Sequence, residues 1–147
     1  MRPAARDLYD LDFFEWAVRN AGLLRAGRFD EADIERIAEE LEDMGKRDRR
    51  ELLSRLQVLL AHLLQWRLQP ERRSPSWEET IDTQRVEIAD LLQDMPSLRN
   101  ALPGALPQIY LHAARRALKE TQLPRSALPN TCPLTLDQIL DAEFLPE

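Results

Sequence analysis

The chain has 147 residues and a formal net charge of −6, from 20 lysines and arginines against 26 aspartates and glutamates. Apolar residues make up 44% of the sequence, too many for a disordered acidic chain and enough for one hydrophobic core. The longest apolar run covers only residues 58–61, far short of the roughly 20 residues of a membrane span, and no secretory signal is expected. A single cysteine excludes an internal disulfide and favours a reducing compartment, so we expect a cytoplasmic protein.

The first predicted helix lies between Asp12 and Gly27. Asp12 is a candidate N-cap, because Glu15 follows three residues later as the partner of a capping box. Gly27 is placed to stop the helix. Its apolar stripe consists of Phe13, Trp16, Ala17, Leu23 and Leu24.

The second predicted helix is very long. Carboxylates at residues 30–33 favour its first turn, and Pro70 ends it. Apolar residues keep a spacing of three and four across Gly45, so we expect one helix of roughly 38 residues and about 57 Å. A break at Gly45 is the alternative, since glycine costs about 1 kcal/mol relative to alanine inside a helix. The stripe consists of Ile34, Ile37, Ala38, Leu41 and Met44, followed by Leu52, Leu56, Leu59, Leu63 and Trp66.

Two further main helices are predicted. Ser76 and Glu79 suggest a capping box for the third helix, which is followed by Pro96. Ser97 is a candidate cap for the fourth helix, and we expect its regular part to begin near Pro107 because of the prolines within its pattern. The inward residues of the third helix are expected to be Ile81, Gln84, Ile88, Leu91 and Leu92.

The last part of the chain combines a loop with a short helix. Three prolines within residues 123–133 predict an extended loop, and Thr135 with Gln138 predicts a capped helix over residues 136–141. Phe144 and Leu145 are expected to dock the tail on the bundle. The sequence therefore predicts an all-α fold, a bundle of four main helices, one very long, plus a short C-terminal helix. We expect one domain of residues 1–147, with residues 1–8 as a candidate disordered segment.

Five strings in a fixed order carry a family resemblance. They are YDLDFFEWA at residues 9–17, LLRAGRFDEAD at 23–33, IAEELEDMGKRDRRELLSRLQVLLAHLLQW at 37–66, QPERRSPSWEETIDTQR at 69–85 and CPLTLDQILDAEFLP at 132–146. Together they resemble the bacterial family called domain of unknown function twenty-nine. The resemblance implies a small all-helical bacterial domain and brings no activity, cofactor or partner with it. The chain departs from the family at residues 121–124, where Gln122 replaces a helix-stopping glycine.

Charge is unevenly distributed along the long predicted helix. Residues 30–43 hold eight acidic residues and one arginine, whereas residues 46–73 hold eight basic and three acidic residues. One interpretation is a solvated helix surface with charge pairs four residues apart. The other is a molecule that docks electrostatically, head to tail or onto a partner.

Four carboxylates suggest a metal site. Glu39 with Glu42, and Glu87 with Asp90, place two carboxylates three residues apart on each of two helices, a spacing that can share a divalent cation. The arrangement resembles the magnesium site of the all-helical nucleotide pyrophosphohydrolases, where the metal would activate water against a phosphate. One alternative function is therefore an Mg²⁺- or Mn²⁺-dependent nucleotide phosphohydrolase with these four metal-binding and catalytic residues. The acidic pairs are equally typical of solvated helix faces.

Three arginines suggest an anion site. Arg67, Arg72 and Arg73 lie near Trp66 and Trp77 and close to a predicted helix N-terminus, as in sites that bind anions or single-stranded nucleic acid. The net charge of −6 argues against nucleic acid. The other interpretation is that the arginines tie the loop to an acidic helix face while the tryptophans anchor the core.

Two other reactive residues imply no cofactor. His62 lies among leucines without a Glu-x-x-His pair, so we expect a boundary residue hydrogen-bonded to a neighbour. Cys132 has no catalytic signature around it, and we expect a structural thiol.

The long helix favours an interaction protein over an enzyme. A helix of that length exceeds a compact domain of this size, so part of its apolar stripe needs a partner surface, which a second copy would supply. We therefore expect a small cytosolic protein–protein interaction module that self-associates or binds another protein. No cofactor is expected, nor a nucleic acid or membrane partner. The phosphohydrolase and the anion binder stay as alternatives.

Overall fold

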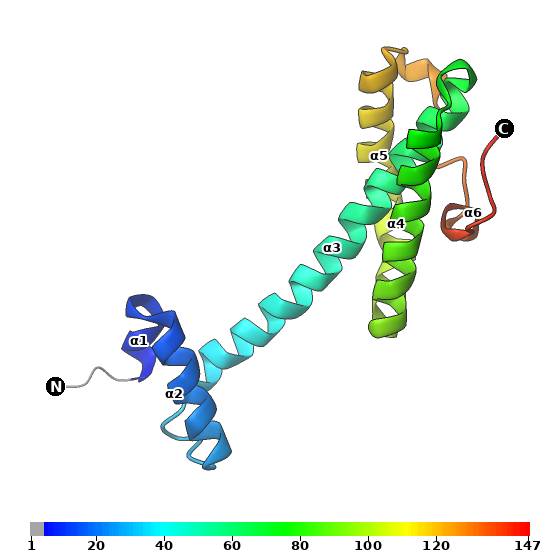
Figure 1. Ribbon diagram of the computed structural model, residues 1–147. Coiled ribbons are helices and arrows are strands. Elements are labelled where there is room, and N and C mark those ends of the chain that lie inside the picture. The colour runs from blue at the N-terminus through cyan, green and yellow to red at the C-terminus, as the bar shows by residue number, and fades with distance from the viewer. Residues whose placement is uncertain (1–4) are drawn as a thin grey trace. The chain divides into compact units, whose positions relative to one another are not determined.

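The computed structural model describes residues 5–147, and this part is built from helices without a strand (Figure 1). The all-α prediction is confirmed. The chain divides into two compact units, Met1–Arg47 and Asp48–Glu147, which are described separately. Of the candidate disordered segment, residues 1–4 lie outside the described residues and residues 5–8 belong to helix α1. The helices are α1 (Ala5–Leu11), α2 (Phe13–Arg25), α3 (Ile34–Leu68), α4 (Pro75–Asp94), α5 (Leu102–Thr121) and α6 (Leu136–Leu140), with 3-10 helices η1 (Pro70–Arg72), η2 (Pro96–Ala101) and η3 (Arg125–Ala127).

Helix α3 is continuous through Gly45, as predicted, and has 35 residues. At 1.5 Å per residue its length is about 52 Å. Glycine costs about 1 kcal/mol relative to alanine here, and the helix tolerates this cost because good helix formers such as Glu42, Met44 and Lys46 surround Gly45. The helix ends at Leu68, two residues before Pro70, because proline disfavours helical backbone at the residue that precedes it. One helix therefore supplies side chains to both units.

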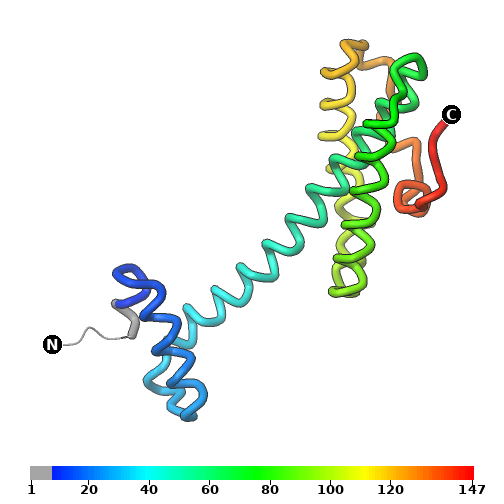
Figure 2. The backbone as a smooth tube through the Cα atoms, viewed as in Figure 1, coloured from blue at the N-terminus to red at the C-terminus, as the bar shows by residue number. Residues whose placement is uncertain are grey.

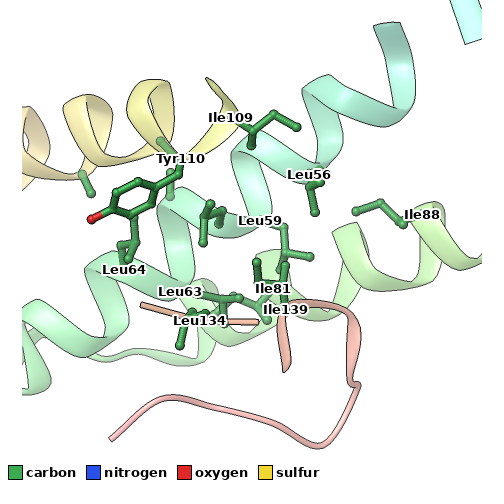
Figure 3. Packing of buried hydrophobic residues seen from close by; sticks show 14 of the residues in the cluster. Leu56, Leu59, Leu63, Leu64, Ile81, Ile88, Ile109, Tyr110, Leu134 and Ile139 are labelled. Carbon is green, nitrogen blue, oxygen red and sulfur yellow. The ribbon is translucent and has the colours of Figure 1, made fainter. Parts of the chain in front are cut away.

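The hydrophobic core lies in the second unit, where the last four turns of α3 pack with α4, α5 and the C-terminal segment (Figures 2 and 3). Ten consecutive positions of α3 from Leu56 to Gln65 include seven buried residues. Phe144 and Leu145 pack against this core, which confirms the predicted docking of the tail. The core residues labelled in Figure 3 are Leu56, Leu59, Leu63, Leu64, Ile81, Ile88, Ile109, Tyr110, Leu134 and Ile139.

Arg85, not Gln84, is the inward polar residue of α4. Gln84 is half-buried and accepts a hydrogen bond from Arg55, whereas Arg85 is 5% exposed. The Arg85 guanidinium donates to the carbonyl oxygens of Ile139 (2.9 Å) and Gln138 (3.4 Å), in the last turn of α6, where cations are favoured. Burial lowers the pKa of Arg85, and the nearby Asp141 carboxylate opposes this effect. Arg85 therefore holds α6 on the core.

The N-terminus of α4 differs from the prediction. The N-cap is Ser74, whose hydroxyl accepts the backbone N–H of Trp77 at 3.2 Å, so the predicted capping box of Ser76 and Glu79 is wrong. The reason is Pro75, which is favoured at the first helical position, where no N–H is needed. The predicted N-caps Asp12 and Thr135 are confirmed, whereas Ser97 caps no α-helix, because α5 begins after Ala101. Asp12 accepts from the N–H of Glu15, and Thr135 and Gln138 form a complete capping box.

Helix α5 begins at Leu102, five residues before the predicted start at Pro107, and Ser97 lies in the preceding η2. Pro103 is tolerated because it stands in the first turn, whose N–H groups have no intrahelical acceptors. Pro107 stands inside the helix and forfeits one backbone hydrogen bond. The loop that follows α5 contains η3, and the hydroxyl of Tyr110 holds it by donating to the carbonyl of Pro129 at 2.6 Å.

The first unit is held together by a buried polar contact between α2 and the start of α3. Asn20, 2% exposed, accepts the backbone N–H of Asp33 at 2.8 Å and donates to the carbonyl of Trp16 at 2.9 Å. The indole N–H of Trp16 donates in turn to the Asp33 carboxylate at 3.2 Å. Gly27, with φ 72°, ends α2 with the paired hydrogen bonds of a Schellman motif, as its position predicted. The turn between α2 and α3 is thereby fixed.

Gln122 ends α5 in a left-handed conformation, with φ 58°. Adopting this conformation costs a residue with a Cβ about 1–2 kcal/mol, and glycine does not bear this cost. Glycine also makes the unfolded chain more flexible, which cancels part of the gain in folding stability. We therefore expect Gln122→Gly to raise the free energy of unfolding by about 0.5–1 kcal/mol. Gly27→Ala should lower the free energy of unfolding, because alanine would have to adopt the left-handed conformation of Gly27. Urea denaturation measures both, and an unchanged or lower stability of Gln122→Gly would contradict the account.

Candidate functional site

Large hydrophobic side chains are exposed mainly in the first unit. Among residues 8–147, whose side chains are described, eleven large hydrophobic residues are exposed and nine of them precede Gly45. We call these nine the N-terminal apolar residues: Leu11, Phe13, Phe14, Val18, Leu24, Phe29, Ile34, Leu41 and Met44. Five of them belong to the predicted apolar stripes, so the first unit leaves part of each stripe exposed.

The helices of the first unit hold these residues on a fixed framework. Tyr9 of α1 makes edge-to-face contacts with Phe13 and Trp16, at centroid distances of 5.7 and 5.1 Å. Its hydroxyl donates to the Glu40 carboxylate of α3, and this hydrogen bond raises the pKa of Tyr9. The Arg36 guanidinium lies 4.2 Å from the centre of the same ring. These contacts join α1, α2 and α3, so the exposed apolar side chains of α1 and α2 are carried by helices that pack against one another.

The middle of α3 is exposed and charged. Residues 41–47 and 49–51 are all exposed, with acidic side chains before Gly45 and mostly basic ones after it. Within residues 5–147, neither the acidic Glu42 and Asp43 nor the basic Lys46, Arg49 and Arg50 form an ion pair within 4.0 Å. These charges are available to a partner.

The four carboxylates of the predicted metal site belong to different units. Glu39 and Glu42 lie on α3 in the first unit, and Glu87 and Asp90 lie on α4 in the second. Glu87 is 3.9 Å from a guanidinium nitrogen of Arg55. In the described part of the chain, no three His, Cys, Asp or Glu side chains are grouped as a metal site. The metal-dependent phosphohydrolase stays a prediction.

The three arginines of the predicted anion site have different roles. Arg73 donates to the carbonyls of Trp66 (2.9 Å) and Pro146 (3.4 Å), and its guanidinium lies 5.0 Å from the centre of the Trp66 ring. Arg73 therefore ties the C-terminal tail to the end of α3. Arg67 is exposed, and Arg72 lines a polar cleft in the second unit.

The polar cleft has a volume of about 270 Å³ and is formed by side chains from α3, η1, α4 and α5. Helix α3 contributes His62 and Gln65, and Gln69 follows its last residue. Gln65 interrupts a run of leucines in phase with the core, which is a local signal for a polar site. Arg116 and Glu120 could not be predicted, because α5 follows more than 30 residues later in the chain. The remaining lining residues are Arg72 and Trp77.

His62 is hydrogen-bonded to a neighbour, as predicted. Its Nδ1 lies 2.9 Å from the carbonyl oxygen of Val58. A carbonyl only accepts, so Nδ1 carries the hydrogen and Nε2 is left without a partner among residues 5–147. The thiol of Cys132 donates to the carbonyl of Leu134 at 3.3 Å, and burial raises its pKa, in agreement with a structural role.

The described residues define an all-helical protein with its core in the second unit and an exposed apolar set in the first. The family model described as "Domain of unknown function DUF29" matches residues 8–145, and the chain belongs to this family. No curated protein and no solved structure shows significant similarity to this chain. Within residues 5–147, no helix is both long and apolar enough to cross a membrane.

The different roles of Arg72 and Arg73 can be tested by stability. Arg73→Ala should lower the free energy of unfolding by about 1.5–3 kcal/mol, because it removes a charged donor from two carbonyls. Arg72→Ala should change it by less than about 0.5 kcal/mol, since the Arg72 side chain is exposed and unpaired within the described residues. Thermal and urea denaturation give both values. Equal destabilisation by the two variants would contradict this assignment.

Proposed function

We propose that the protein is a helical interaction module that self-associates through its N-terminal apolar residues and the exposed middle of α3. The observation that carries the proposal is the concentration of exposed large hydrophobic side chains in the first unit, including Phe14 at 79% and Leu41 at 64% exposure. Contiguous or clustered exposure of this kind is typical of protein interaction surfaces, whereas single exposed apolar residues are common on any protein.

The small core of the first unit supports the need for a partner. Among residues 8–47 the buried hydrophobic residues are Leu8, Trp16 and Ala32, whereas the core cluster of the second unit contains eighteen buried residues. Units of about 40 residues usually need a disulfide, a metal or oligomerisation to be stable. With one cysteine in the chain, an internal disulfide is not possible. A protein surface is the stabiliser that the exposed apolar side chains fit best.

The order of charge along α3 favours a second copy as the partner. Acidic residues precede Gly45 and basic residues follow it, so two antiparallel α3 helices would place the acidic stretch of each beside the basic stretch of the other. Such a contact is isologous, because the same surface serves both copies. A Cβ built at Gly45 meets nothing within 4 Å, and the missing side chain would let a second helix approach closely.

The proposal places the module in the bacterial cytoplasm and assigns it no cofactor. The single cysteine supports a reducing compartment, and the resemblance of the sequence strings to a bacterial family supports the source.

Charged substitutions within the N-terminal apolar residues should prevent self-association. We expect Phe14→Glu and Leu41→Glu each to weaken it by at least about tenfold, or about 1.4 kcal/mol, because a carboxylate would be buried in the contact. Val86→Glu is the matched control, since Val86 is 58% exposed on α4 of the second unit. Sedimentation velocity over a wide concentration range measures the effect. A wild-type monomer at every concentration would overturn the proposal.

Charge reversal distinguishes a second copy from a foreign partner. One variant carries Glu42→Arg and Asp43→Arg, and the other carries Arg49→Glu and Arg50→Glu. In the antiparallel arrangement each variant repels itself, but the two attract each other when mixed. We expect two monomeric variants that associate on mixing. Unchanged self-association of either variant would contradict the antiparallel contact.

A further inference from the structure

We infer that the polar cleft of the second unit is a binding site for a small oxyanion, a phosphate or carboxylate group carried by a metabolite. The inference is independent of the proposed self-association, which uses residues 11–50. The cleft lies among α3, η1, α4 and α5, around the end of α3 that is packed in the core. Its volume of about 270 Å³ is slightly below the range of drug-sized sites, so it fits a small ligand.

Gln65 is the first feature that indicates a ligand. It is 5% exposed, it lines the cleft, and its carboxamide makes no hydrogen bond to any described residue. Arg85 Nη1 is the buried side-chain polar atom without a partner among the described residues, so the polar atoms of Gln65 still reach the cleft and are open to a ligand there. The amide N–H groups of Gln65 can donate to an oxyanion that enters the cleft.

The charges around the cleft determine the sign of the ligand. Arg72 from η1 and Arg116 from α5 both line it, and neither side chain forms an ion pair within residues 5–147. Two arginines on separate elements match the oxygens of a phosphate or carboxylate, which guanidinium groups bind in bidentate geometry. Glu120 is the one acidic residue of the lining, which leaves the formal balance positive.

His62 and Glu120 complete the set of groups that a ligand would meet. With Nδ1 of His62 bonded to the Val58 carbonyl, Nε2 is the ring atom that is free to accept a ligand hydroxyl or, when protonated, to donate to an oxyanion. Glu120 can accept a hydroxyl hydrogen. The cleft therefore suits an oxyanion on a small hydroxylated molecule better than a simple halide.

Isothermal titration of the full chain tests the site with inorganic phosphate and, separately, with malate, each against chloride at matched ionic strength. We expect one of the two oxyanions to bind and chloride not to compete. Tighter phosphate binding identifies a phosphate ligand, and tighter malate binding identifies a carboxylate. Arg116→Gln should weaken binding by about tenfold or more, because it removes one charged donor without touching the core. Arg99→Gln, an exposed arginine of η2, is the matched control.

Gln65→Glu provides a second test, since it keeps the size of the side chain but adds a negative charge, and it should abolish binding. Trp77 lines the cleft, so the ligand should change tryptophan fluorescence in the wild type but not in Trp77→Phe. Binding that is equal in the wild type, Arg116→Gln and Gln65→Glu would overturn the inference. Failure of both oxyanions to bind more tightly than chloride would overturn it as well.

Discussion

The unbroken hydrogen bonding of α3 through Gly45 is the constraint on which the other features depend. A helix cannot fold back on itself, so the leucines at its C-terminal end cannot cover Leu41 and Met44 near its beginning. The C-terminal half is buried by α4, α5 and the tail, and the middle is exposed and charged. Glycine in this position costs about 1 kcal/mol relative to alanine, and the helix tolerates this cost because good helix formers surround it. The same helix therefore serves as a core element in one unit and as the carrier of an unpartnered surface in the other.

Four arginines of the second unit differ in what their side chains contact. Arg73 and Arg85 donate to backbone carbonyls that are far away in sequence, and they hold the tail and α6 against the core. Arg72 and Arg116 have no such partners among the described residues, although they line a polar cleft. Arg73 and Arg85 use donors on backbone carbonyls, although Nη1 of Arg85 is buried without a hydrogen-bond partner among the described residues. Arg72 and Arg116 keep their donors for a ligand. This difference is the physical basis for assigning Arg72 to a site and Arg73 to the fold.

Local signals in the sequence predicted the elements well. The unbroken apolar phase predicted α3 through Gly45, and short side-chain caps predicted the starts of α2 and α6, because both depend on residues within a few positions of each other. The cap of α4 was misplaced because two serines compete there and Pro75 decides between them. The start of α5 was misplaced because the penalty for proline is small in a first turn.

Features that depend on packing between distant segments could not be predicted from local sequence patterns. The length of the long helix predicted that part of its apolar stripe is not covered by the same chain. Which residues are exposed, such as Phe13 and Leu41, could not be predicted, because a stripe shows only which face of a helix is apolar. From its residue type alone, Arg85 would be predicted to face the solvent. It is buried because α6 presents backbone carbonyls that accept its hydrogen bonds. The polar cleft combines Gln65 with Arg116 from a helix that follows much later, and only the packing of α5 brings them together.

Hydrogen–deuterium exchange along α3, measured on the full chain at low and at high protein concentration, tests the central claim most directly. The backbone amides of residues 52–65 should be strongly protected at both concentrations, since they belong to the core of the second unit. The amides of residues 34–51 should exchange quickly at low concentration and become protected at high concentration, as a second copy covers this part of the helix. Protection of residues 34–51 that is the same at both concentrations would contradict the claim that a second copy covers them.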